Sequence, residues 1–352
     1  MLRLLILLTL IIGMGCRTRP FLMRGMMDVN GAMKMSGNMN TSMKTDNTAS
    51  RLASVVIQSG KNSNCEPIGK VAIIDIDGIL INKNISGLGS MNENPVALFR
   101  EKLDALRLDP MVRAVVLRIN SPGGGVTATD IMSRDIISFR QETQIPVVAC
   151  LMDVGAGGAY YLATHTDAIV AHPTSIVGGI GVILNVYNLE DTLGQFNIAS
   201  QPIKAGDQID IASTERAMEK GERATLQKIA DAFHTRFIDQ VKSVRPNSAG
   251  YKENFEGGIF TGTEAQKNGL VDDVGYLDDA LAIARIKSNL GADSSVVMLR
   301  RDNDRAYSQF DVTPNTPYSL LPIKMPGLDR STLPTFLYLW QADPSYLTSA
   351  GG

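Results

Sequence analysis

Apolar runs and amphipathic segments alternate through the middle of the chain. Nearly continuous apolar residues predict buried strands at 71–76, 112–119 and 147–151. Between these strands, segments that begin near Pro95 and Thr127 carry apolar residues at roughly helical spacing, which predicts two helices. Strands that alternate with helices are typical of an α/β fold, in which helices cover a parallel sheet.

The same pattern continues after residue 200 and ends near residue 300. A long helix is predicted from a cap at Ser213 or Thr214 to about Ser243, because one apolar stripe runs along it. A helix at 278–287 and a strand at 295–300 complete the pattern. We therefore predict one folded domain over residues 70–300.

Two of the predicted strands run directly into clusters of glycine. The strand that ends at Ile119 is followed by the sequence NSPGGG at 120–125, and the strand at 147–151 is followed by AGGAYYLA at 156–163. Glycine lets a ligand approach the backbone closely, and bare N–H groups beside a helix start suit the binding of an oxyanion.

These two motifs, with two later ones, resemble the signal peptide peptidase family, also called SppA or protease IV, of the ClpP/crotonase superfamily. The later motifs are TSIVGGIGV at 174–182 and KAGDQID at 204–210. All four occur in the order that the family has. The resemblance implies a ClpP/crotonase-like spiral of β-β-α units with a long C-terminal helical segment.

The resemblance also implies a catalytic site. The family hydrolyses peptides with a serine nucleophile and a lysine base, and Lys204 matches the base position. Gly157 matches the position of the nucleophilic serine. The backbone N–H groups of Gly124 and Gly158, with neighbouring Gly123, match the oxyanion and substrate-binding positions. The implied ligand is an extended peptide or a signal peptide, and no cofactor is implied.

Glycine has no hydroxyl with which to attack a carbonyl, so three functions compete. The chain is a membrane-associated serine endopeptidase that uses an unrecognised nucleophile, a peptide-binding pseudopeptidase, or a crotonase-like enzyme that needs only the oxyanion hole. Ser121 is not expected to replace the nucleophile, because the family keeps this serine beside the true one. The histidines match no catalytic position of the family; they are His165, His172 and His234.

The amino end predicts export and attachment to a membrane. Residues 1–16 combine a short basic start, an apolar run too short to span a bilayer, and a cysteine, which is typical of a lipoprotein signal. Cys16 is the expected lipid anchor. Residues 17–69 are rich in Met, Asn and Ser, and no His or Cys joins the methionines in the Met-rich stretch at 21–63, so we predict a flexible tether rather than a metal site.

The remaining features concern the carboxyl end and possible partners. Residues 301–352 form a Pro-rich tail, whose apolar patch at 336–340 should pack somewhere or contact the membrane. A formal net charge of −2 gives no electrostatic reason to expect nucleic acid. The chain has one set of family motifs, so the resemblance implies a homo-oligomer in which Lys204 approaches Gly157 of a neighbouring copy.

Overall fold

The computed structural model describes residues 52–59, 69–85, 93–301, 306–313 and 336–340, together with the backbone of two short strands near the amino end. The chain forms two units, Met1–Ala49 and Ser50–Gly352. In the first unit, β1 (Gly25–Met27) and β2 (Met33–Met35) pair antiparallel. Cys16 and the predicted signal lie outside the described residues.

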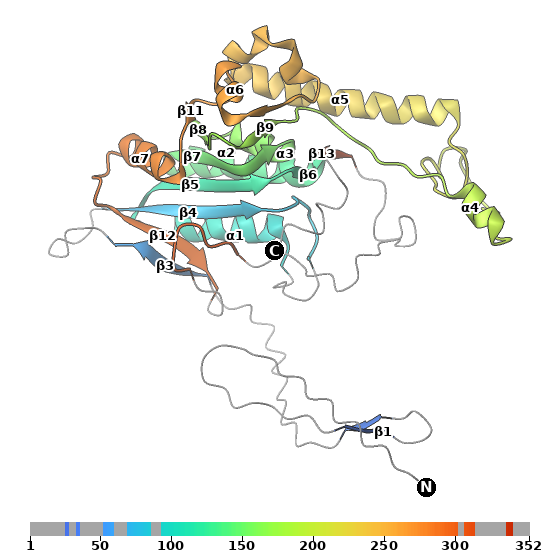
Figure 1. The fold of residues 1–352 in the computed structure, drawn as a ribbon, viewed down its shortest axis with the longest axis horizontal. Helices are drawn as coiled ribbons and strands as arrows, with labels where there is room; N and C mark the ends of the chain where they lie inside the picture. Colours follow the sequence, from blue (N-terminus) through green and yellow to red (C-terminus); the bar gives the residue numbers. More distant parts are fainter. Residues whose placement is uncertain are drawn as a thin grey trace. The chain divides into compact units, whose positions relative to one another are not determined.

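A mixed sheet forms the centre of the second unit (Figure 1). Its strands follow one another in the order β10-β9-β7-β5-β4-β12-β3, and β8 pairs with the first half of β7 and with β11. The strands are β3 (Ala53–Gln58), β4 (Lys70–Asp77), β5 (Val112–Ser121), β7 (Val147–Ala156), β8 (Ala168–Ala171), β9 (Ile176–Gly178), β10 (Ile259–Thr261), β11 (Asp273–Val274) and β12 (Ser295–Arg300).

The central strands β12, β4, β5 and β7 run parallel, which confirms the α/β class predicted from the sequence. The domain begins one strand before its predicted start at Lys70. Residues Ala53–Gln58 form β3, which pairs antiparallel with β12 at the edge of the sheet. This strand was missed because only its alternate residues Val55 and Ile57 pack against the core, a weak signal beside a polar segment.

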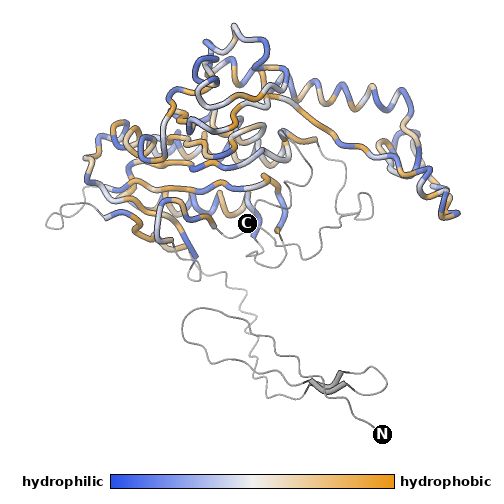
Figure 2. Tube along the Cα trace, in the orientation of Figure 1, coloured by the Kyte–Doolittle hydropathy of each residue, from blue (hydrophilic) through white to orange (hydrophobic). Residues whose placement is uncertain are grey.

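Alternate residues of the central strands face two separate hydrophobic clusters. On one face, Ile74 and Leu117 pack with α1 (Pro95–Arg107), α2 (Val126–Thr143) and α3 (Gly158–Ala163). On the other face, neighbouring strand residues pack with α7 (Leu277–Lys287). Figure 2 shows mostly hydrophobic colours along these strands. Because both faces are covered, the strands read as continuous apolar runs rather than alternating ones.

The long helix α5 (Lys220–Val244) is capped by Glu219, later in the chain than the cap predicted at Ser213 or Thr214. The structure instead places a capping box at Glu219 and Glu222, and Arg216 holds the preceding turn by pairing with Glu222 and Asp210. The helix leads to short elements that return the chain to the sheet: the 3-10 helices η1 (Pro246–Gly250) and η2 (Lys252–Phe255), then α6 (Gly262–Lys267).

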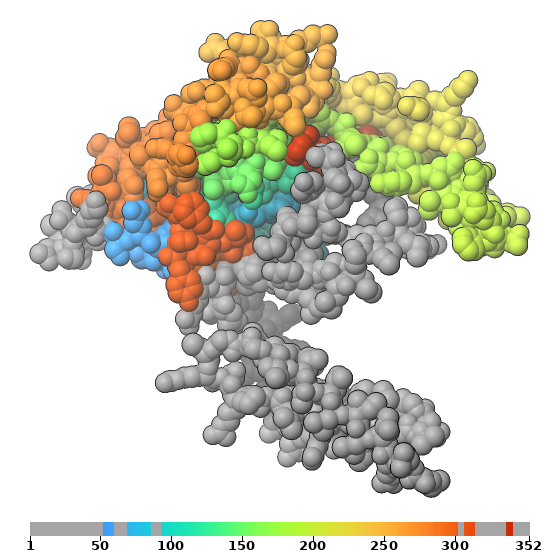
Figure 3. Space-filling model, in the orientation of Figure 1, coloured from blue at the N-terminus to red at the C-terminus, as the bar shows by residue number. Residues whose placement is uncertain are grey.

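Residues 186–219, which we call the arm, extend from the body beside the first half of α5. The arm contains α4 (Glu190–Gln195), and Figure 1 and the space-filling view of Figure 3 show it projecting from the sheet and its helices. Only the second half of α5 packs into the core, through Phe237 and Val241, which are fully buried.

The carboxyl tail contacts the body at both of its described stretches, through Thr313, whose N–H donates to Asp75, and through residues 336–340. Residues Leu337–Leu339 form β13, which pairs antiparallel with β6 (Gly123–Gly125). The prediction that this apolar patch packs against something is therefore confirmed, and its partner is the first glycine motif.

Candidate active site

Both glycine motifs lie at the same edge of the sheet. β5 ends at Ser121 and β7 ends at Ala156, and the two strands are parallel neighbours, with Ser121 opposite Gly155. Ligands of open α/β sheets bind beyond the carboxyl ends of the strands, where loops from neighbouring strands meet. The sheet thus brings Gly123, Gly124, Gly157 and Gly158 together, as the motifs predicted.

Gly157 forms a sharp turn between β7 and α3. Its backbone has φ +55° and ψ −127°, a conformation that residues with side chains rarely adopt. Its N–H donates to the carbonyl of Gly178 at 2.9 Å, which fixes the turn. A strained turn from strand to helix is also how some serine hydrolases present their nucleophile. Here the turn carries no side chain.

Ser121 supports the neighbouring loop. Its hydroxyl accepts a hydrogen bond from the N–H of Gly123 at 3.1 Å, and the residue is completely buried. Gly123 has φ +101°, so the loop needs glycine there. Ser121 therefore shapes the loop, as expected, and its buried hydroxyl is already engaged with the backbone.

The carbonyl of Tyr338 lies among these glycines. A Cβ atom added to Gly157 would come within 2.5 Å of the Tyr338 oxygen, and one added to Gly158 would come within 3.3 Å of it. A Cβ on Gly123 would collide with the same oxygen. No motif indicated that Tyr338 belongs to this site, since this residue lies in an apolar patch of a Pro-rich tail.

Lys204 lies on the arm, apart from the glycine motifs of its own chain. Its Nζ donates to both carboxylate oxygens of Asp210, at 2.8 and 3.0 Å, and to the carbonyl of Asp207 at 3.3 Å. Hydrogen bonds from Arg216 and then Lys204 lower the pKa of Asp210 well below its usual value. In Figure 1 the arm stands away from α3 and β6, so the fold of one chain does not bring Lys204 to Gly157.

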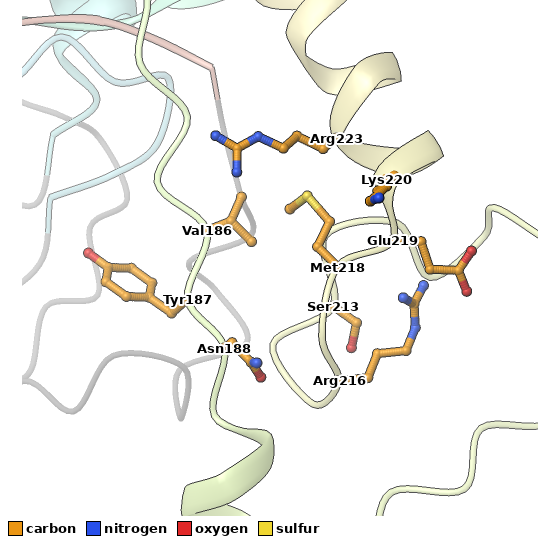
Figure 4. Close-up of a pocket in the computed structure, with 9 residues that line it drawn as sticks. All are labelled: Val186, Tyr187, Asn188, Ser213, Arg216, Met218, Glu219, Lys220 and Arg223. Carbon is orange, nitrogen blue, oxygen red and sulfur yellow. The ribbon is translucent and has the colours of Figure 1, made fainter.

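A pocket of about 300 Å³ lies between the arm and the first turn of α5 (Figure 4). Arg216, Lys220 and Arg223 give it a basic lining, but Arg216 is held by Asp210 and Glu222. The pocket contains none of the motif glycines and belongs to the packing of the arm against α5. Its lining residues are Val186, Tyr187, Asn188, Ser213, Arg216, Met218, Glu219, Lys220 and Arg223.

The histidines bond to the backbone or to a nearby threonine. His165 Nδ1 lies 2.8 Å from the carbonyl of Tyr161, and burial lowers the pKa of His165. His234 Nε2 lies 3.1 Å from the carbonyl of Ile180, and His172 Nδ1 lies 2.7 Å from the hydroxyl of Thr174. Over the described part of the chain, no three His, Cys, Asp or Glu side chains gather as metal ligands.

Comparisons with known proteins agree with the motifs. The sequence profile of peptidase family S49 matches residues 139–291. A protein of Enterococcus faecium named after the signal peptide peptidase SppA is 27% identical over 234 residues, which are 66% of this chain and 67% of that protein. Protease 4 of Salmonella typhi is 30% identical over 217 residues, 61% of this chain and 34% of the relative. The chloroplastic serine protease SPPA of Arabidopsis thaliana is 33% identical over 201 residues, 56% of this chain and 29% of the relative.

The chain thus spans about a third of the length of the Salmonella and Arabidopsis relatives. The matched profile covers the Gly157 turn, Lys204 and helix α5, whereas the first glycine motif, at 120–125, precedes the matched residues. The chain carries a peptidase family S49 domain at 139–291, and its relatives include the signal peptide peptidase SppA and protease 4 proteins.

Proposed function

We propose that this protein is a peptide-binding member of family S49 whose peptidase activity is lost or strongly reduced. The observation that carries the proposal is the turn at Gly157, which has the position and strained backbone suited to a nucleophile but no side chain. A hydrolase without its nucleophile keeps only the rate supplied by binding and the oxyanion hole, ~10³–10⁴ over water.

The ligand proposed for the site is an extended peptide, such as a signal peptide or another unfolded segment. The backbone of β6 pairs with β13, and Leu337 of β13 bridges to Ile183 on its other side. A bound peptide would pair with these same two backbone edges. Binding by strand addition draws affinity from main-chain hydrogen bonds and selectivity from pockets for alternate side chains. The names of the relatives, signal peptide peptidase and protease 4, agree with a peptide ligand.

The alternative of an active serine endopeptidase needs another nucleophile. Ser121 lies nearest to the site in sequence, yet its hydroxyl is buried and accepts from Gly123. Ser175 is also buried, and its hydroxyl donates to the carbonyl of Leu151 at 2.8 Å. Both serines serve the backbone, so neither is favoured as the nucleophile, and the pseudopeptidase function is the better proposal.

A hydrolysis assay tests this function. The full chain and its Lys204→Ala variant are incubated with a fluorogenic signal-like peptide, and turnover is measured. We expect the same background rate for both proteins, because a lysine base has no hydroxyl to activate. Turnover that depends on Lys204 would overturn the proposal, and its loss in Ser121→Ala would identify the nucleophile.

We further propose that the arm packs against a second copy of the chain. Four large apolar side chains on the arm are more than half exposed: Phe196, Ile198, Ile203 and Ile209. Exposed apolar side chains gathered on one projecting segment are typical of a protein interface. Lys204 follows Ile203 directly, so the same contact would carry the lysine toward the Gly157 turn of the neighbour. The homo-oligomer is thus a proposal that joins two site residues which one chain keeps apart.

The proposed location is outside the cytoplasm, with the domain attached to a membrane through lipid on Cys16. Residues 1–16 would be the signal, and the Met-rich segment up to β3 would be the tether. Along the described ranges, no helix has both the length and the apolar character needed to cross a membrane. The attachment proposed here rests on the sequence of the amino end.

A further inference from the structure

We propose that the peptide groove beside Gly157 is occupied by the chain's own residues 336–340, and that the groove selects peptides through a buried subsite for a tyrosine side chain. The inference deepens the proposed function and rests on it. It names both the internal ligand that a free peptide must displace and the residue type that this peptide must carry.

The segment is bound by its backbone along both edges. On one side, β13 pairs with β6, and the pairing continues past the ends of the strands: the N–H of Val126 donates to the carbonyl of Phe336 at 3.2 Å, and the N–H of Trp340 donates to the carbonyl of Pro122 at 3.0 Å. On the other side, Leu337 and Ile183 exchange two hydrogen bonds of 2.9 Å. The segment therefore lies as a strand between two partners, as an added peptide would.

The position of Tyr338 in this ladder places its carbonyl at the glycines. Hydrogen-bonded and non-hydrogen-bonded pairs alternate along an antiparallel ladder. Because the bonds on either side of Tyr338 connect Phe336 with Val126 and Trp340 with Pro122, the intervening pair of Tyr338 and Gly124 is also a hydrogen-bonded one. Gly124 is a predicted oxyanion donor. The peptide bond after Tyr338 thus lies where a scissile bond would lie.

The glycines are what make this approach possible. A side chain on Gly157 would bring its Cβ to 2.5 Å from the Tyr338 oxygen, and one on Gly179 would come to 3.1 Å from the Cβ of Trp340. Atoms of different residues essentially never approach a Cβ as closely as 2.5 Å. The missing side chain at 157 therefore does more than remove a nucleophile, since it opens the space in which the segment lies.

The side chain of Tyr338 fills a pocket formed by α3 and α5. The residue is 1% exposed, its ring lies 4.9 Å from that of Phe237 and 5.5 Å from that of Tyr161, and its hydroxyl donates to the carbonyl of Phe233 at 2.8 Å. Burial raises the pKa of Tyr338, so the phenol keeps its proton. A pocket with aromatic walls and a carbonyl at its end fits tyrosine best, phenylalanine next, and small or charged side chains poorly.

Because the segment and the groove belong to one chain, the segment competes strongly with a free peptide for the groove. A segment of the same chain competes with a free peptide at an effective concentration, which is on the order of 1 mM for typical intramolecular linkages. If the open groove binds a matching free peptide with a Kd of about 10 µM, the internal segment weakens the apparent affinity about 100-fold. A substitution that weakens the binding of the internal segment should therefore increase the affinity of the groove for a free peptide.

The test measures binding of a fluorescent peptide with the sequence of residues 334–342, PTFLYLWQA, to the full chain. The wild type is compared with Tyr338→Ala and with the matched control Tyr307→Ala, which alters a tyrosine that is 76% exposed. We expect Tyr338→Ala to bind the peptide at least tenfold more tightly than either of the others. A second variant, Leu337→Pro, removes the N–H that Leu337 donates to Ile183 and leaves Tyr338 in place, so it serves if Tyr338→Ala does not fold.

Two altered peptides test the pocket. Against Tyr338→Ala, the peptide with phenylalanine in place of its tyrosine should bind within about tenfold of the original, because one hydrogen bond is lost. The peptide with alanine there should bind at least about 100-fold more weakly, because the aromatic ring is lost. Equal binding of all three peptides would overturn the tyrosine subsite.

Two further outcomes separate this inference from the proposed function. If the wild type and all variants bind the original peptide equally tightly, the groove binds peptides but is not self-occupied, and only the inference fails. If no variant binds any peptide while hydrogen exchange shows the Leu337 amide protected in the wild type, the segment is a fixed strand of the fold. Both the inference and the peptide-binding function would then be wrong.

Discussion

Replacing Gly157 with serine restores the missing hydroxyl, but the structure predicts that the substitution is opposed. Residue 157 has φ +55°, and the added Cβ would lie 2.5 Å from the Tyr338 oxygen and 3.0 Å from the Pro122 oxygen. A non-glycine residue in such a conformation costs about 1–3 kcal/mol. We therefore expect Gly157→Ser to lower the melting temperature by roughly 2–12 °C.

The hydroxyl should create peptidase activity only where a peptide can reach it. Since the Tyr338 carbonyl occupies the space that the new side chain needs, we expect the largest gain in the double variant Gly157→Ser with Tyr338→Ala. The assay follows cleavage of a fluorogenic peptide carrying tyrosine, and activity should disappear when Lys204→Ala is added. Gly181→Ser is the matched control, because a Cβ there meets its nearest neighbour at an ordinary 3.7 Å.

Two results would refute this reasoning. If Gly157→Ser melts at the wild-type temperature, the contacts with Tyr338 and Pro122 do not constrain the turn. If the double variant folds and binds peptide yet cleaves nothing, the site lacks more than a hydroxyl, and the lysine of a neighbouring copy does not reach it.

Three further predictions concern assembly, attachment and pH. Light scattering should show an assembly larger than a monomer for the wild type and a smaller one for Ile203→Asp, which places a charge on a fully exposed apolar position of the arm; a wild-type monomer at micromolar concentration would contradict the proposed oligomer. Metabolic labelling with a lipid precursor should tag the protein, and labelling that survives Cys16→Ala would exclude that cysteine as the anchor. Burial raises the pKa of Asp77 to about 6, above its unfolded value, although Arg118 donates to it at 2.9 Å. The folded state therefore holds the proton of Asp77 more tightly than the unfolded state does, so the free energy of unfolding should fall by up to about 3 kcal/mol as pH rises from about 4 to 6. Urea unfolding should show a weaker dependence of this free energy on pH for Asp77→Asn than for the wild type. The same pH dependence in both proteins would disprove this assignment.

Much of the fold could be predicted from the sequence, because its signals are local. Strands buried on both faces need continuous apolar residues, and β4, β5 and β7 were predicted from that pattern alone. The glycine motifs predicted a backbone that a ligand can approach closely, and Gly157 indeed adopts a conformation that residues with side chains rarely take. Helix boundaries were harder to predict, and the start of α5 was misplaced because Arg216 holds the preceding residues in a turn through Asp210 and Glu222, ion pairs that no hydrophobic pattern reveals.

The tertiary structure decided which segments share the site. No local pattern could connect β3 with β12 or Tyr338 with Gly124, because these pairs are far apart in the chain and are joined only by strand pairing. The sequence likewise placed Lys204 and Gly157 in one catalytic motif set, whereas the fold puts them on the arm and on the body. By itself the sequence determined the family, the parallel sheet and the missing hydroxyl. Only the packed chain shows that the space left by this hydroxyl is taken by the protein's own carboxyl tail, because a backbone carbonyl can approach a glycine where a side chain would exclude it.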